Sequence, residues 1–281
     1  MLKLALTGVG AVAAVAVLLT PATSFAGATV TIGNATTARA YTDTYSNFTI
    51  IDTAATAPNG GLLSTFRYYA ANTGTFQFVV VDSANTVTWV SNEITAAAIG
   101  VNTYTPSVPV PVTTGERVGV YFASTGSIPF DYTATTPDPY TPNNNGLPEV
   151  GDSLNIQGSS GRDYSYQADE QACSFAIGAP LAGGDKVFSA NRGAIPVKLT
   201  GCSVDGLAPT VAVTRTSGDP SETTVAATSV SAADSGSTMR YDATAGQYVY
   251  NLAASGLGAG TYQVTVSIAG VPVATETFGL R

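Results

Sequence analysis

The sequence predicts an all-β protein with an N-terminal jelly-roll-like β-sandwich and a C-terminal immunoglobulin-like (Ig-like) β-sandwich. Apolar and polar residues alternate over 262–268, which is the period of a half-buried strand. Short apolar runs recur along the chain between turn signals of Gly, Pro and Asn, a pattern typical of sandwiches with many strands. No segment after residue 26 has the spacing of an amphipathic helix.

Residues 1–26 are expected to form a signal peptide that is removed on export. An apolar run over 4–19 is followed by small residues at Ser24 and Ala26, the spacing that a signal peptidase recognises. The alternative is an uncleaved membrane anchor, but the run is shorter than the ~20 residues that span a bilayer. We therefore expect a secreted, extracellular chain that begins at Gly27 and has no membrane association after cleavage.

Charge and composition exclude several classes of function. The net charge of −8 disfavours nucleic acid and anionic membranes as partners, because both attract cationic protein faces. The chain contains no histidine, which removes Ser-His-Asp and Cys-His triads and the usual zinc sites. We therefore predict no catalytic residues, no metal site and no cofactor.

Residues 27–172 are expected to form the jelly-roll-like domain. Its expected strands cover 28–32, 47–51, 62–69, 75–81, 86–90, 102–105, 108–112, 117–122, 130–135, 152–157 and 162–167. Three prolines at 106, 109 and 111 restrict the strand over 108–112 to an edge or an extended connection. The Pro- and Asn-rich stretch 137–148 is expected to be a long loop inside this domain, which closes near Gln171.

Residues 173–184 are expected to be a linker, because 179–184 holds small residues, one proline and two glycines. The second domain, 185–281, has expected strands over 195–199, 210–214, 237–241, 247–252, 261–268 and 271–280. The pattern Leu-x-x-Gly-x-Tyr-x-Val-x-Val over 257–266 predicts a tyrosine corner at Tyr262, as in Ig-like sandwiches.

Five segments of this second domain together carry a family resemblance. They are Ile-Pro-Val-Lys-Leu at 195–199, Met-Arg-Tyr-Asp at 239–242, Gln-Tyr-Val-Tyr-Asn-Leu at 247–252, Gly-Thr-Tyr at 260–262 and Phe-Gly-Leu-Arg at 278–281. In this order they resemble the PxKF domain family over 185–281, with Leu199 in place of the Phe that names the motif. The resemblance implies an Ig-like module of a bacterial exported protein, and it implies no active site. The N-terminal region resembles no family.

The only two cysteines, Cys173 and Cys202, are expected to form one disulfide, since disulfides form and persist in exported proteins. The alternative, two separate thiols, is less favoured. A nucleophilic thiol would need a nearby base, and no histidine exists to serve as one.

The acidic residues give weak signals of chemistry. Six glutamates occur singly, and we interpret each as a solvated loop or edge charge: Glu93, Glu116, Glu149, Glu170, Glu222 and Glu276. Four acids bracket the Asn-rich loop and offer the oxygen ligands that calcium prefers: Asp131, Asp138, Glu149 and Asp152. Their spacing matches no defined calcium loop, so a solvated polar loop is the favoured interpretation.

Aromatic side chains are the remaining candidates for ligand binding. Seven of the 14 tyrosines offer a possible platform for sugar rings: Tyr41, Tyr45, Tyr68, Tyr69, Tyr104, Tyr121 and Tyr140. Among them Tyr140, in a Pro-rich segment, is expected to be the most exposed. For the single tryptophan, Trp89, core packing is favoured over sugar stacking because it lies in an apolar strand.

These observations favour a secreted bacterial non-enzymatic structural or interaction protein of the extracellular space or cell envelope. The alternative is a carbohydrate-binding module built on 27–172, and a glycan-active hydrolase is the least favoured. The ligand-binding residues are unknown at this stage. The partner is also unknown; a cell-surface or extracellular polysaccharide or protein fits the composition.

Overall fold

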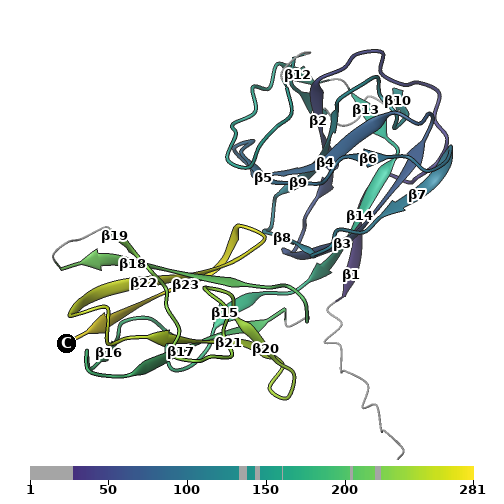
Figure 1. The fold of residues 1–281 in the computed structure, drawn as a ribbon. Helices are drawn as coiled ribbons and strands as arrows, with labels where there is room; N and C mark the ends of the chain where they lie inside the picture. The colour runs from purple at the N-terminus through teal and green to yellow at the C-terminus, as the bar shows by residue number, and fades with distance from the viewer. Residues whose placement is uncertain (1–27, 133–137, 143–145, 160, 203–204, 219–222) are drawn as a thin grey trace, which may run out of the picture.

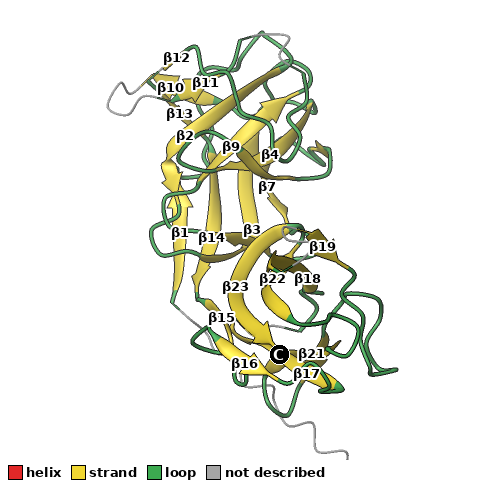
Figure 2. Cartoon of the chain, turned by 90° about the vertical axis from the view of Figure 1, so that its left-hand side faces the viewer, coloured by secondary structure: helices red, strands yellow, loops and turns green. Residues whose placement is uncertain are grey.

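The computed structural model describes residues 28–132, 138–142, 146–159, 161–202, 205–218 and 223–281. The described chain is all-β, as expected, and contains strands, turns and loops but no helix (Figure 2). Within these ranges there is accordingly no helix long and apolar enough to cross a membrane. The expected signal peptide, 1–26, lies outside the described residues.

The first sandwich consists of a five-stranded and a seven-stranded sheet (Figure 1). The five-stranded sheet contains, in spatial order, β1 (Thr29–Gly33), β14 (Tyr166–Ala172), β3 (Gly61–Ala70) and β7 (Gly100–Tyr104), with β8 (Val110–Val112) also beside β3. The seven-stranded sheet contains β12 (Gly158–Ser159), β11 (Pro139–Tyr140), β2 (Phe48–Thr56), β9 (Arg117–Phe122), β4 (Thr75–Val81) and β5 (Val87–Val90), with β6 (Ile94–Thr95) beside β4. A small ribbon, β10 (Phe130–Tyr132) and β13 (Arg162–Tyr164), lies at one end.

The strand pairs of the first sandwich are nested in the manner of a jelly roll. Among its eight main strands the first pairs with the last, β1 with β14, and the second with the seventh, β2 with β9. Inside these lie the pairs β3–β7 and β4–β5, all antiparallel. This rolled-up arrangement of one long hairpin is the connectivity of jelly rolls, so the sequence-based prediction is confirmed.

Aromatic side chains from both sheets fill the first core. Phe66 of β3 stacks on Phe78 of β4 with ring centroids 4.7 Å apart, which joins the two layers. Val80 faces this core, whereas Val79 and Val81 lie on the other face of β4, beneath Leu154. The seven-stranded sheet is therefore buried on both faces here, which explains why β4 ends in a continuous apolar run instead of an alternating one.

The second sandwich has the strand order of an Ig fold. One sheet contains β15 (Phe175–Ile177), β17 (Ala194–Gly201), β21 (Gln247–Ala253) and β20 (Arg240–Asp242). The other contains β16 (Lys186–Phe188), β23 (Val271–Leu280), β22 (Gly260–Ile268), β18 (Thr210–Ser217) and β19 (Thr223–Val225). The chain crosses from the first sheet to the second between β15 and β16, and β16 then runs parallel to β23. This order matches the two sheets of Ig domains.

The predicted tyrosine corner is present at the start of β22. Tyr262 is fully buried and its ring stacks on Phe278 at 5.5 Å. Its hydroxyl donates to the carbonyl oxygens of Leu257 and Gly258, which lie five and four residues upstream, respectively. These bonds hold the loop against the strand that follows it, as in Ig-like sandwiches.

The two sandwiches are joined without a free linker, which corrects the expected linker over 173–184. Only two residues separate β14 of the first sandwich from β15, and β15 pairs with β17 in the second. Ile177 and Leu181 are buried in the second core, so the small residues at 179–184 form a turn within that sandwich. The linker was expected from Pro, Gly and small residues, but a turn inside a domain and a linker between domains have the same composition.

Two further predictions met different outcomes. Among the described strands β8 pairs with β3 alone, so its one proline, Pro111, lies at an edge as expected. The expected strand over 152–157 is wrong, because the structure places only an isolated bridge there, between Thr86 and Ser153. This segment covers the outer face of the seven-stranded sheet, where side-chain contacts with Val79 and Val87 replace strand pairing.

Candidate functional site

The predicted disulfide between Cys173 and Cys202 is formed, with the Cα atoms 5.3 Å apart. It lies at the joint of the two sandwiches, where Cys173 directly follows β14 and Cys202 directly follows β17. Gly201 makes this crossing possible: it has φ +107°, and a Cβ there would overlap the carbonyl oxygen of Ser174. Leu62, a residue of β3, is buried in the second core, so apolar packing also crosses the joint.

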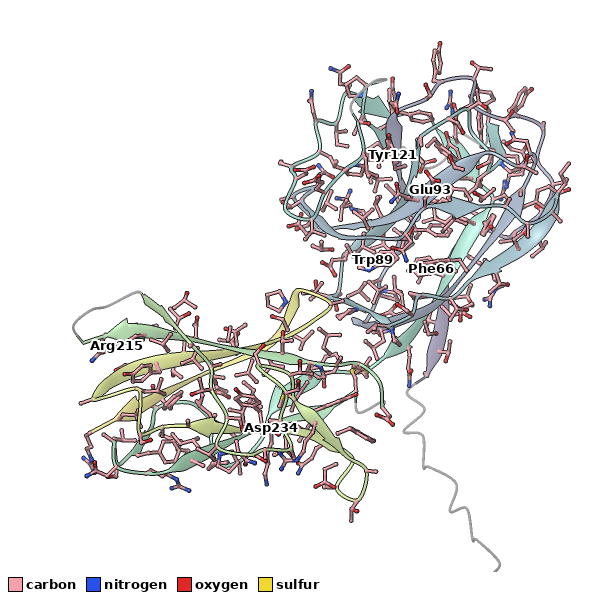
Figure 3. The ribbon with its side chains drawn as sticks, in the orientation of Figure 1. Phe66, Trp89, Glu93, Tyr121, Arg215 and Asp234 are labelled. Atoms are coloured by element: carbon pink, nitrogen blue, oxygen red, sulfur yellow. A yellow bond between two sulfur atoms is a disulfide. The ribbon has the colours of Figure 1, made fainter. Side chains whose placement is uncertain are left out.

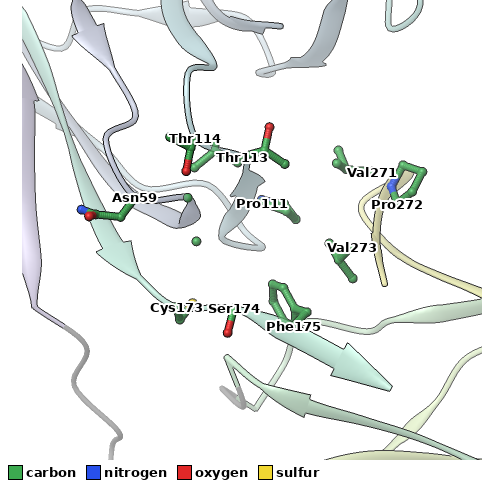
Figure 4. A pocket seen from close by; sticks show the side chains of 13 residues that line it. Asn59, Pro111, Thr113, Thr114, Cys173, Ser174, Phe175, Val271, Pro272 and Val273 are labelled. Carbon is green, nitrogen blue, oxygen red and sulfur yellow. The ribbon is translucent and has the colours of Figure 1, made fainter. Parts of the chain in front are cut away.

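A cavity of about 290 Å³ opens beside the disulfide, between β8 and the start of β23 (Figure 4). Apart from Phe175, its lining residues are small or medium-sized, and no lining residue is charged. The lining residues labelled in Figure 4 are Asn59, Pro111, Thr113, Thr114, Cys173, Ser174, Phe175, Val271, Pro272 and Val273. The cavity lacks titratable groups that could perform chemistry, so it offers at most a binding surface.

A smaller pocket of about 150 Å³ also lies between the two sandwiches and has aromatic walls. Trp89 of β5 and Tyr104 of β7 come from the edges of the two sheets, and Ala269 comes from the β22–β23 turn of the second sandwich. The ring of Trp89 stacks on Phe66, with centroids 5.7 Å apart and the planes 12° from parallel (Figure 3). Trp89 thus packs against the first core, as favoured from the sequence, while part of it lines the pocket.

The end of the first sandwich around β10 and β13 carries a second aromatic group. Tyr41 and Tyr132 are more than half exposed, and their ring centroids lie 5.1 Å apart. The Arg162 guanidinium lies 4.3 Å from the centroid of Phe130 beneath them and binds the carboxylate of Asp43 at 2.5 Å. We call this the distal tyrosine group, because it lies at the far end of the first sandwich from the second (Figure 1).

The seven tyrosines of the expected platform do not form one surface. Tyr41 and Tyr45 are exposed, but Tyr68 and Tyr121 are buried, and three others are half-buried: Tyr69, Tyr104 and Tyr140. The expectation for Tyr140 is wrong, because β11 pairs with β2 and its ring packs against the first core. Tyr132 was missed; its position just before the Pro-rich stretch was the available signal.

Two buried carboxyls near the distal tyrosine group have perturbed pKa values. Burial raises the pKa of Asp52 to about 7, and Asp163 adds to the rise. Burial also raises the pKa of Asp138 to about 7, with repulsion from Asp52 as the next cause. Asn34 donates to Asp52 at 2.7 Å, and both acids are almost completely inaccessible to solvent. Pairs of this kind can serve as acid and base in active sites, but a substrate would have to reach them.

The four acids considered as calcium ligands are dispersed. Asp131 pairs with Arg39 at 3.5 Å, whereas Asp138 is buried near Asp52. Glu149 and Asp152 close a turn on another part of the domain, where the Glu149 amide donates to Asp152 at 2.8 Å. Within the described ranges no three acidic or cysteine side chains are grouped to hold a metal ion.

Two of the six glutamates are buried, which corrects their interpretation as solvated charges. Glu170 is fully buried and accepts from the Asn59 amide at 3.1 Å. Glu116 accepts from the Thr113 amide at 2.6 Å, and burial raises its pKa. Both carboxylates stabilise turns by accepting hydrogen bonds from backbone amides. Glu93 and Glu149 are exposed, Glu276 is half-buried, and Glu222 lies outside the described residues.

Comparison with known proteins gives no assignment. No protein-family model matches the sequence. No curated protein sequence matches it at a significant level.

Proposed function

We propose that this chain is an exported bacterial protein that works as a non-enzymatic interaction protein of the extracellular space or cell envelope. The observation that carries the proposal is the contrast between its acids and its aromatics. The carboxyls with perturbed pKa values, Asp52 and Asp138, are sealed inside the sandwich, while rings such as Tyr41 and Tyr132 are open to solvent. The exposed rings can contact a binding partner, whereas a substrate outside the sandwich could not reach the two buried carboxyls to use them as acid and base.

The joint between the sandwiches supports the same proposal. A direct strand connection, a disulfide and shared apolar packing hold the two domains as a unit that can present one surface. The resemblance of 185–281 to the PxKF domain family adds a bacterial exported context to the proposal. The disulfide and the low fraction of charged residues, 11%, also suit an extracellular setting.

A second candidate function is carbohydrate binding by the first sandwich. Exposed aromatic faces suit the apolar CH faces of sugar rings, and this sandwich places aromatics at two surface positions, the distal tyrosine group and the Trp89–Tyr104 pocket. Jelly rolls include lectin domains, which makes the scaffold compatible with this role by analogy alone.

Binding and catalysis can be separated with the mature protein, 27–281. A glycan array and isolated bacterial envelopes should retain the protein, and the same glycans should release no reducing sugar during long incubation. Retention on envelopes but on no glycan would favour a protein partner over a carbohydrate. Release of reducing ends that Asp52→Asn or Asp138→Asn abolishes would overturn the non-enzymatic proposal.

A further inference from the structure

We propose that the Trp89–Tyr104 pocket is a carbohydrate subsite that holds a single sugar ring and that both sandwiches complete. The inference rests on carbohydrate binding, the second function proposed above, and deepens it by assigning the site. It also means that the first sandwich alone is not expected to bind the sugar fully. A module cut at residue 172 would lack Ala269 and so would lack one wall of the pocket.

The aromatic wall of the pocket is fixed in place before any ligand arrives. The Trp89 ring is held by its stacking on Phe66, and the Tyr104 ring lies 6.0 Å from the same phenylalanine. Burial raises the pKa of Tyr104, and the backbone of Asn92 lies within hydrogen-bond reach of its hydroxyl. A preorganised pair of rings loses little conformational entropy when a ligand stacks on it.

Two polar residues also line this pocket. Asn92 and Ser107 are among the residues that line it, and both are exposed. The Asn92 carbonyl accepts from the Ser91 hydroxyl, but neither the Asn92 nor the Ser107 side chain has a hydrogen-bond partner among the described residues. An amide offers two donors and an acceptor, and a hydroxyl offers one donor and two acceptors. Aromatic faces combined with uncharged donors and acceptors match a neutral sugar, which has apolar CH faces and a rim of hydroxyls.

The volume decides how much of a ligand can enter. At about 150 Å³ the pocket has about half of the ~300 Å³ at which pockets for drug-sized molecules begin. It therefore accommodates one ring, such as the end of a glycan chain, and not several units. The distal tyrosine group lacks comparable enclosure: Tyr41 and Tyr132 pack on each other and on Phe130.

The single tryptophan makes the inference directly testable. Because Trp89 is the only tryptophan, its fluorescence reports on this pocket without interference from other sites. The full mature chain is titrated with oligosaccharides of glucose, N-acetylglucosamine, xylose and mannose. At least one should shift or quench the Trp89 emission with saturation. Asn92→Ala should then weaken the affinity about tenfold, the effect of one lost hydrogen bond to a ligand.

Two more variants separate the pocket from the rest of the protein. Ala269→Leu adds bulk from the second sandwich at an exposed turn, leaves the first sandwich unaltered and should abolish the fluorescence response. Tyr41→Ala is the matched control in the distal tyrosine group and should leave the response unchanged. If calorimetry detects sugar binding while the Trp89 emission does not change, this inference is overturned but carbohydrate binding is not. The same holds if sugar binding is lost in Tyr41→Ala and in no other variant. Absence of calorimetric binding to every sugar overturns both.

Discussion

Replacing Asp138 with asparagine should stabilise the first sandwich at neutral and alkaline pH. Asp138 and Asp52 are buried, and their pKa values rise from 3.8 in the unfolded reference to about 7. Each carboxyl binds its proton more tightly in the folded state than in the unfolded state. The free energy of unfolding therefore falls as pH rises from about 4 to about 7, and the loss is complete above that window.

The magnitude follows from the size of the shift. A pKa that rises from 3.8 to about 7 corresponds to about 4 kcal/mol for one isolated group, since a tenfold change in proton affinity is worth about 1.36 kcal/mol. Part of the rise at Asp138 comes from Asp52, so the two contributions overlap. We therefore expect Asp138→Asn to raise the free energy of unfolding by about 2–4 kcal/mol at pH 8, and to change it little at pH 4.

Trp89 fluorescence can follow this transition, because the only tryptophan lies in the first sandwich. Urea unfolding of wild type and Asp138→Asn is measured from pH 4 to pH 9. Asp131→Asn is the control, since Asp131 is partly exposed in its ion pair with Arg39 and surface pairs of this kind contribute little. A wild-type stability that is flat or rises between pH 4 and 7, or a variant that keeps the wild-type slope, would refute the reasoning.

Three further predictions concern the second sandwich and the joint, and urea unfolding followed by tyrosine near-UV circular dichroism measures all of them. Replacing Cys173 and Cys202 by serine opens a loop with a separation of 29 residues and should cost about 3–4 kcal/mol; an unchanged midpoint would show that the crosslink does not constrain the unfolded chain. Tyr262→Phe removes the corner hydrogen bonds and should cost about 1–2 kcal/mol, with a neutral result counting against the corner. Gly201→Ala should cost roughly 1–3 kcal/mol from its φ of +107° alone, and more if the Ser174 carbonyl cannot move, so wild-type stability would contradict the described crossing.

Local pattern was sufficient to predict most of the fold. The alternation over 262–268 predicted β22, and the spacing before it predicted the role of Tyr262, because both depend on neighbours within a few residues. The cysteine pair was predictable from count and expected compartment. The boundary between the sandwiches could not be predicted in this way. Only the long-range pairing of β15 with β17 shows that residues 175–177 belong to the second sandwich.

The candidate site was far less predictable than the fold. Asp52 and Asp138 are 86 positions apart (138 − 52), and no spacing rule connects an apolar strand with the start of a Pro-rich stretch. The Trp89–Tyr104 pocket needs the edges of two sheets and a turn from the other sandwich. Sequence reasoning named both aromatics but could not bring them together, because their proximity is a property of the assembled fold.

The most direct test of the proposed function is retention of the mature chain on isolated bacterial envelopes and on a glycan array, with reducing-sugar release measured on the same glycans. The proposal predicts saturable retention without any release of reducing ends, in wild type and in Asp138→Asn alike. Release of reducing ends by wild type that is lost in Asp138→Asn would contradict it, and so would an absence of retention on every surface tested.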